Sequence, residues 1–513
     1  MAVGSGAELC DLNGLPVTAR SAEAVRHFDE GLLRWHALDG GIVEAFERAV
    51  AADPGFAVAH AALALRHLLS GSPATAREPA ARSAALAAAL GDHLTARERG
   101  NVAVADLAVR GERLRALEAA RAHVAAYPRD ELVVRLAGIL ISQGGAPDRQ
   151  EQSLALYAGV APHYPDEPWL LGQRAFLLTE LGRFAEARPL VERALARDSR
   201  GGWLAHCVAH LCFESGDHGR GAAFLRERLP GSDPEGGYYG HNWWHLAVFQ
   251  LSLGRFRAAL ATYEHGVSPL VVRQRTTLTD AVGFLWRCQL FGYAARAPLP
   301  WRAVLDYVEE RLRPGAVAGG SLIHALVWAN AAVAFVAAGD DAAFDNLVEG
   351  LRRADPATDP VPGEVVLPLA LGMRAFARGD HEAAADLLGA VAGGLVRIGG
   401  SNEQRSIFED TLLEAQLRAG RHAEVEAHLR RRLAQRTTAR DLFWLGRAQA
   451  GSGQAAAAGA SLDRALELWA EADSDSPEVA EAKRLAGMVR HGVLPDPVQV
   501  TRGAVSGRPR LRR

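Results

Sequence analysis

Two pairs of histidines in this sequence are spaced so that the members of each pair could act together. His206 and His210 occupy the segment HCVAH, and His241 and His245 occupy HNWWH. Residues four apart lie on one face of an α-helix, so both imidazoles of a pair can reach the same ion or substrate. Neutral imidazoles are borderline ligands that suit Zn, Cu, Ni or Fe. Without a metal, the same groups could serve as acid and base in small-molecule chemistry.

The residues between the paired histidines argue against one familiar metal chemistry. They are Cys-Val-Ala and Asn-Trp-Trp, so neither pair carries the glutamate of the zinc-peptidase motif HExxH. The alternative is a polar network in which the imidazoles hydrogen-bond Asn242, Tyr238 or Tyr239 and form a pocket for an organic ligand. The sequence leaves both interpretations open.

A repeated helical unit would position these histidines. An amphipathic helix, a Gly-polar turn and an Ala-rich amphipathic helix recur, as in LLTELGRFAEARPLVERAL from Leu177 and AVFQLSLGRFRAALATYEHGV from Ala247. The unit resembles the tetratricopeptide repeat, in which turn glycines and small alanines let two antiparallel helices approach closely. Strand signals are nearly absent. We therefore predict an all-α, tetratricopeptide-repeat-like superhelix (α-solenoid) of antiparallel helix pairs.

The repeat signal also predicts how the chain is divided. We expect the superhelix to span residues 21–490, with atypical repeats to about residue 165 and clearer repeats after it. An N-terminal segment, residues 1–20, precedes it. Residues 491–513 carry arginine without an apolar pattern, so we predict a disordered Arg-rich tail there.

Two sequence signals mark helix starts within the predicted superhelix. Ser476 followed by Pro477 places a capping residue before a proline at the first helical position. The segment Ser401-Asn402-Glu403-Gln404 has the spacing of a capping box, in which a serine and a glutamine satisfy each other's backbone N–H groups. Both signals predict that a helix begins directly after the serine.

The repeat register gives the histidines a common direction. In a tetratricopeptide hairpin the first helix lines the concave surface, and neighbouring first helices lie side by side. Counted back from the turn glycines, both histidine pairs fall at concave-facing positions, so we expect the imidazoles to converge in one groove. Arg405, on another first helix, could hold an anionic substrate. For Asp410 and Glu414 on that helix, the favoured interpretation is a solvated face.

Composition restricts the classes of partner. The 513-residue chain has a formal net charge of -3 at pH 7, whereas nucleic-acid binding needs a basic face. We therefore expect no nucleic-acid partner. The sequence shows no signal peptide and no apolar run long enough to span a membrane. We therefore also expect no membrane partner. The four cysteines lack CxxC spacing, which indicates a reducing cytoplasm.

Several motifs together resemble the tetratricopeptide repeat protein 38 family. The likeness covers most of the chain and is most specific from Trp203 to Val267 and from Arg397 to Leu417. Glu403 departs from it, because a smaller residue would be expected there. The resemblance implies the fold and a candidate site, but supplies no reaction. The matching positions are His206, His210, His241, Asn242, His245, Gly399, Gly400, Ser401, Gln404 and Arg405.

Two hypotheses for function follow. The first is a binding protein whose His-rich concave groove holds a peptide, a protein or a small ligand. The alternative is a metal-binding protein or an enzyme that uses the paired histidines for small-molecule chemistry, with a transition metal as the candidate cofactor. The sequence does not decide whether the protein is an enzyme. The candidate ligand or groove residues are His206, His210, His241, Asn242, His245 and Arg405, and the histidines are also the candidate metal ligands.

Overall fold

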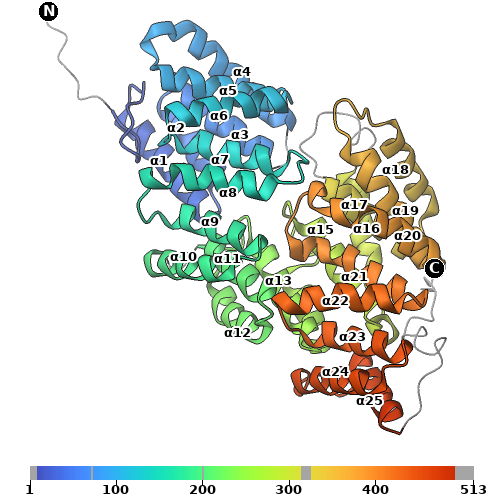
Figure 1. The fold of residues 1–513 in the computed structure, drawn as a ribbon. Coiled ribbons are helices and arrows are strands. Elements are labelled where there is room, and N and C mark those ends of the chain that lie inside the picture. The colour runs from blue at the N-terminus through green and yellow to red at the C-terminus, as the bar shows by residue number, and fades with distance from the viewer. Residues whose placement is uncertain (1–8, 71–72, 199–200, 313–324, 492–513) are drawn as a thin grey trace, which may run out of the picture.

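The computed structural model describes residues 9–70, 73–198, 201–312 and 325–491. In Figure 1 their helices run from the N-terminal end at the upper left to the C-terminal end at the lower right. The first helices are α1 (Ala22–Ala37), α2 (Ile42–Ala52), α3 (Ala57–Leu69), α4 (Pro73–Leu90), α5 (Ala96–Val109), α6 (Arg113–Ala126), α7 (Glu131–Ser142), α8 (Arg149–Val160), α9 (Pro168–Glu180), α10 (Phe184–Arg197), α11 (Gly202–Glu214) and α12 (His218–Arg228). They are followed by α13 (Tyr239–Ser252), α14 (Phe256–Gly266), α15 (Thr277–Leu290), α16 (Trp301–Arg311), α17 (Ala325–Ala338), α18 (Asp341–Arg353), α19 (Leu367–Arg378), α20 (His381–Val391), α21 (Asn402–Arg418), α22 (His422–Gln435), α23 (Ala439–Gly451), α24 (Ala455–Leu468) and α25 (Pro477–Arg490).

Consecutive helices pack as antiparallel pairs, and the pairs stack into a superhelix (Figure 1). Helix α9 packs on α10, α13 on α14 and α23 on α24, while first helices of neighbouring repeats, such as α9, α11 and α13, also touch. Within the described ranges, the one extended pairing is an isolated bridge between Cys10 and Pro16. The prediction of an all-α, tetratricopeptide-repeat-like solenoid is confirmed.

The local signals that define the repeats are present as predicted. The turn glycines Gly182, Gly216 and Gly254 have φ values of 72°, 78° and 73°, which residues with a Cβ rarely adopt. Ser401 caps α21 in a reciprocal capping box with Gln404. Ser476 caps α25, which begins with Pro477. These helix starts are therefore confirmed.

Two large apolar cores run through the described part of the solenoid. One lies between α1 and α9, and the other extends from α9 to α25. The C-terminal repeats contact the central ones. Asp473 N donates to Gly254 O at 3.0 Å, and Arg436 Nη1 donates to Glu214 Oε2 at 3.1 Å. Helix α21 packs against α11, α15 and α19. The concave side of the central repeats is therefore covered by another part of the chain.

In the described part of the chain, every helix is too short or too polar to cross a membrane. The tail predicted over residues 491–513 lies outside the described residues from 492 onward, as do the first eight residues of the predicted N-terminal segment.

Candidate functional site

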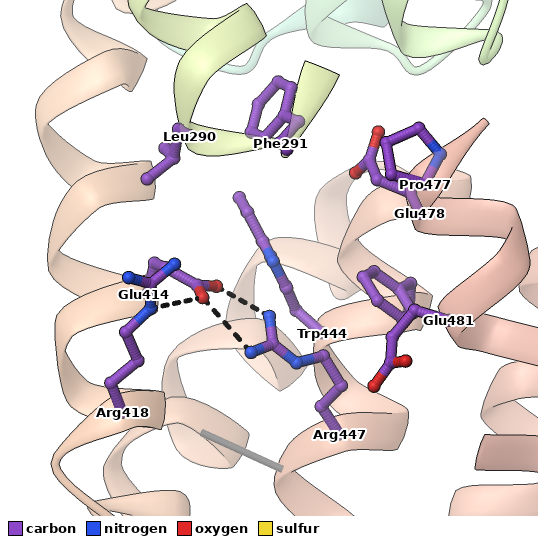
Figure 2. Close-up of a pocket in the computed structure, with 11 residues that line it drawn as sticks. Leu290, Phe291, Glu414, Arg418, Trp444, Arg447, Pro477, Glu478 and Glu481 are labelled. Atoms are coloured by element: carbon purple, nitrogen blue, oxygen red, sulfur yellow. Dashed lines mark hydrogen bonds and ion pairs between the residues drawn. The ribbon is translucent and has the colours of Figure 1, made fainter. Parts of the chain in front are cut away.

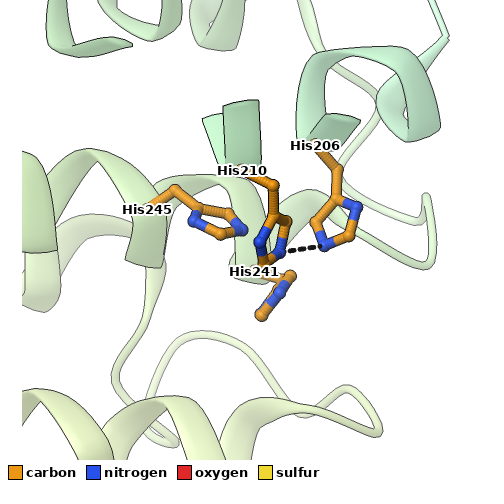
Figure 3. A group of neighbouring side chains, drawn as sticks. All are labelled: His206, His210, His241 and His245. Carbon is orange, nitrogen blue, oxygen red and sulfur yellow. Dashed lines mark hydrogen bonds between the residues drawn. The ribbon is translucent and has the colours of Figure 1, made fainter. Parts of the chain in front are cut away.

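The four candidate histidines meet between two neighbouring first helices. His206 and His210 lie on α11, and His241 and His245 lie on α13. One ring nitrogen of each lies within 4.8 Å of the others, and the Nε2 atoms of His206 and His210 are 3.0 Å apart. Figure 3 shows the four rings gathered around one point. The two pairs of histidines therefore converge, as their spacing predicted.

Three of the four imidazoles have a carboxylate behind them. His241 Nδ1 donates to Asp280 Oδ2 on α15 at 2.9 Å. His245 Nδ1 lies 2.9 Å from Oε2 of Glu403 on α21. His210 Nδ1 lies 3.5 Å from Oε1 of Glu180 on α9. Such contacts fix ring orientation and direct Nε2 away from the carboxylate, which is the arrangement found behind metal-ligating histidines.

His206 is held by aromatic rings instead of a carboxylate. Trp203 and Phe176 stack on its ring at centroid distances of 5.2 and 5.5 Å, and Tyr238 contacts it at 4.4 Å. Its Nδ1 is buried and has no hydrogen-bond partner among the residues that the structure describes. Packing therefore sets the orientation of this fourth imidazole.

The site is buried, and its electrostatics favour neutral imidazoles. Burial, followed by the neighbouring imidazoles, holds the pKa of His206 and His245 well below its usual value. Burial also lowers the pKa of His210, although Glu180 opposes the effect. Burial raises the pKa of Glu403 well above its usual range, against the nearby guanidinium of Arg287. Neutral imidazoles keep a lone pair free for a metal ion.

The exposure of the cluster differs from the prediction. The sequence placed the histidines in an open concave groove, but the four side chains are between 0 and 3% exposed. The reason is the packing of α21 against α11 and α15, which covers the concave side at this point. The cluster is an enclosed site in the described chain.

The two other predicted groove residues serve local structure. Arg405 donates to the carbonyl oxygens of Gly399 and Gly400 and to Asn402 Oδ1, and its Nη2 lies 3.9 Å from Glu180 Oε2. Arg405 is therefore linked to the cluster indirectly, because Glu180 lies near both Arg405 and His210.

Asn242 and the tyrosines also differ from the hydrogen-bonding alternative. Asn242 Nδ2 donates to Gly202 O at 3.0 Å, which ties α13 to the start of α11. Tyr238 contacts His206 through its ring. The histidines hydrogen-bond each other, at His206 and His210, and otherwise pair with carboxylates such as Asp280 and Glu403.

The solvated face predicted for Asp410 and Glu414 is wrong, because both are buried in ion pairs. Arg432 donates to Asp410 Oδ1 at 3.0 Å. Arg447 and Arg418 both bind Glu414, as Figure 2 shows beside a small pocket between α15, α21, α23 and α25. The register correctly gave these acids the inward direction of the histidines, but it does not reveal Arg432 on α22 and Arg447 on α23, which bind them from other helices.

Sequence reasoning missed the three acids that support the histidines. Asp280 lies in the apolar segment LTDAVGFLW, where an isolated acid is itself a sign of a buried partner. Glu403 lies in the capping-box segment and departs from the family pattern, but neither signal predicts its contact with a histidine. Glu180, two residues before a turn glycine, gave no distinguishing signal.

A cavity of about 220 Å³ lies beside the cluster. Its wall includes Trp169, Trp203, Leu33 and Pro168, with Glu167 among its polar groups. The indole of Trp203, which stacks on His206, stands at the boundary between this cavity and the histidines.

No model of a known protein family matches the chain. A monomeric mutant of IFIT1 with Gppp-AAAA is a similar solved structure, with 14% sequence identity, a TM-score of 0.40, and coverage of 88% of this chain and 96% of that one. The human IFIT1 dimer with PPP-AAAA has 14% identity and a TM-score of 0.39, covering 81% and 91%. Cut9 in the Cut9–Hcn1 complex of the APC/C has 12% identity and a TM-score of 0.34, covering 91% and 96%. Likeness at this level says nothing about what this chain binds.

Proposed function

We propose that this chain is a metal-binding protein that holds a transition-metal ion between His206, His210, His241 and His245. The observation that carries the proposal is the convergence of four buried imidazole nitrogens within 4.8 Å of one another. The Nε2 atoms of His206 and His210 share a hydrogen bond, whereas Nε2 of His245 is buried without a hydrogen-bond partner among the described residues. Polar groups buried without partners are costly, and a cation at the common point of the four rings would remove this cost.

The spacing suits a small divalent ion. Zinc binds histidine nitrogen at about 2.0–2.1 Å, so the ligand atoms of a tetrahedral site lie about 3.3 Å apart. The Nε2 atoms of His206 and His210 are already 3.0 Å apart, and side-chain rotation can bring the remaining nitrogens inward. The carboxylates of Asp280 and Glu180 add negative charge close to the ion, which favours divalent over monovalent binding.

The ligand set also bears on the role of the ion. Four protein ligands close a tetrahedral zinc site, whereas catalytic zinc keeps one position for water or substrate. A fully coordinated ion would stabilise the contact between α11 and α13. With one imidazole unbound, the open coordination position would accept water or a small molecule, and the protein would then act as a metal-dependent enzyme.

A second candidate function is the binding of a small organic ligand in the 220 Å³ cavity. Apolar and aromatic walls with a few polar groups are typical of ligand pockets. Trp169 and Trp203 supply the aromatic surface. A ligand there would contact the histidine cluster through the indole of Trp203. The peptide or protein binding expected of the fold would need surfaces elsewhere, because the cluster is enclosed.

The motifs support two further assignments. We propose membership of the tetratricopeptide repeat protein 38 family, because the matching segments supply the histidine cluster and the Ser401 cap with its Arg405 contacts. We also propose a cytoplasmic location, which agrees with four free cysteines, of which Cys207, Cys212 and Cys288 are buried. The proposed partners include no nucleic acid.

Metal analysis of tag-free protein tests the proposal. We expect about one ion per chain after incubation with Zn²⁺ and removal of excess, and almost none in a His206→Ala, His245→Ala double variant. His218→Ala is the matched control, because His218 is also buried and stacked on an aromatic ring but lies outside the cluster. Circular dichroism verifies that each variant remains helical. Equal metal content in the parent and the double variant would refute the proposal.

A further inference from the structure

The carboxylates behind His210 form a second set of convergent ligand atoms. Glu180, His210 and Glu214 each offer one atom, and these atoms lie within 4.8 Å of one another. The two nitrogens of the His210 ring point to different groups, because Nε2 lies 3.0 Å from His206 Nε2 while Nδ1 lies 3.5 Å from Glu180 Oε1. One imidazole therefore has a group of candidate ligands on each side.

Each of the two carboxylates is anchored through one oxygen and leaves the other free. Oε2 of Glu180 accepts hydrogen bonds from Asn402 N at 2.7 Å and Gln150 Nε2 at 3.1 Å. Oε2 of Glu214 accepts one from Arg436 Nη1 at 3.1 Å. The Oε1 atoms of both glutamates are buried and make no hydrogen bond to any residue that the structure describes. Outer hydrogen bonds of this kind orient carboxylates that bind metals.

The distances at Nδ1 of His210 are long for hydrogen bonds. Nδ1 lies 3.5 Å from Glu180 Oε1 and 4.0 Å from Glu403 Oε2, whereas N–H···O bonds are about 2.7–3.2 Å. Two ligands of one zinc ion, each at about 2.0–2.2 Å from the metal, are separated by roughly 3–4 Å. Glu180 and His210 have at most 1% of their side chains exposed, so water does not satisfy these atoms from the surface.

We propose that Glu180, His210 and Glu214 bind a second divalent cation, so that the imidazole of His210 bridges two metal ions. The inference rests on the proposed four-histidine site, which supplies the first ion. Mixed nitrogen and carboxylate ligands suit Zn²⁺ or Cu²⁺. On binding of the second ion, the proton on Nδ1 of His210 is released to solvent and the ring becomes an imidazolate. Glu403 Oε2, at 4.0 Å from Nδ1 of His210, is a further carboxylate oxygen near this set.

The first test is metal stoichiometry with Zn²⁺. We expect about two ions per chain in the parent and about one in Glu214→Gln, since the amide keeps the shape and weakens the ligand. Glu186→Gln is the control, because Glu186 is an exposed partner of Arg183 on α10. Should the parent and Glu214→Gln both bind about one ion, the second site is refuted while the four-histidine site stands. Binding of none by either would refute the proposed function itself.

The second test is electron paramagnetic resonance of the Cu²⁺-loaded protein. Two Cu²⁺ ions joined by an imidazolate couple their spins, so we expect the parent to give a much smaller signal per copper than Glu214→Gln. Full signal from both coppers of the parent would overturn the bridge. The Glu214→Asp variant keeps the charge on a shorter side chain, and partial recovery of the second ion in it, with unchanged helical content, would support coordination over a structural role.

Discussion

His241 Nδ1 donates a hydrogen bond of 2.9 Å to Asp280 Oδ2, and both side chains are buried. The bond connects the first helices of two successive repeats, α13 and α15. Because an ionised carboxylate only accepts, the contact keeps the proton on Nδ1 and leaves the lone pair on Nε2.

Replacing this acceptor should weaken metal binding without removing a ligand. We expect Asp280→Asn to lower the affinity for Zn²⁺ by about 10–100-fold, the usual cost of losing a carboxylate behind a ligating histidine. Competition with a chromophoric chelator measures the affinity. Asp306→Asn, an exposed change on α16, is the control. An unchanged affinity in Asp280→Asn would mean that His241 is not a ligand.

Metal should also stabilise the folded chain by mass action. At a free Zn²⁺ concentration about 100 times the Kd, the parent should gain about 2.7 kcal/mol. The midpoint of thermal unfolding should rise in the parent and in His218→Ala, and stay unchanged in His206→Ala, His245→Ala. Differential scanning calorimetry with and without Zn²⁺ makes the comparison. A similar rise in the double variant would place the ion elsewhere.

The packing of α12 can be tested with two glycines of one helix. A Cβ at Gly221 would lie 2.4 Å from the Phe249 ring, whereas a Cβ at Gly219 would meet no atom within 4 Å. Overpacking costs about 1–3 kcal/mol, so Gly221→Ala should destabilise the protein. Gly219→Ala should be neutral or stabilising, because alanine favours a helix. Urea unfolding of both variants measures the difference, and equal midpoints would contradict this packing.

The buried ion pairs of Glu414 should make stability depend on acid. Burial alone would raise the pKa of Glu414, but Arg447 and Arg418 outweigh it and lower the pKa to about 2. The group is ionised in the folded state at a pH where the unfolded chain binds a proton. Its contribution, of the order of 3 kcal/mol, is therefore complete above the unfolded pKa of 4.5 and is lost as pH falls towards about 2.

Denaturation at pH 7 and pH 3.5 checks this dependence. The parent should lose more stability between the two values than Glu414→Gln, which cannot titrate at this position. Glu382→Gln serves as the control, because Glu382 binds Arg421 at the surface. Equal losses in the parent and in Glu414→Gln would show that other acids account for the effect.

Local rules explain what the sequence could predict. Turn glycines, the Ser401 capping box and the i, i+4 spacing of the histidines act within one or two repeats, so they identified the helices and the convergence of the imidazoles. Glu403 reaches His245 only because many small rotations between repeats accumulate until α21 meets α11 and α15. The total rotation over many repeats cannot be derived from the sequence of any single repeat. The enclosure of the site by α21 could therefore not be predicted.

The contact of the C-terminal repeats with the central ones changes how the chain should unfold. An open solenoid loses its end repeats one after another, since each contacts only its neighbours. Here the backbone bond from Asp473 to Gly254 and the ion pair from Arg436 to Glu214 join segments far apart in sequence. Helices α11 to α24 should therefore melt as one cooperative unit, and amides near both ends of that span should exchange with deuterium at similar rates.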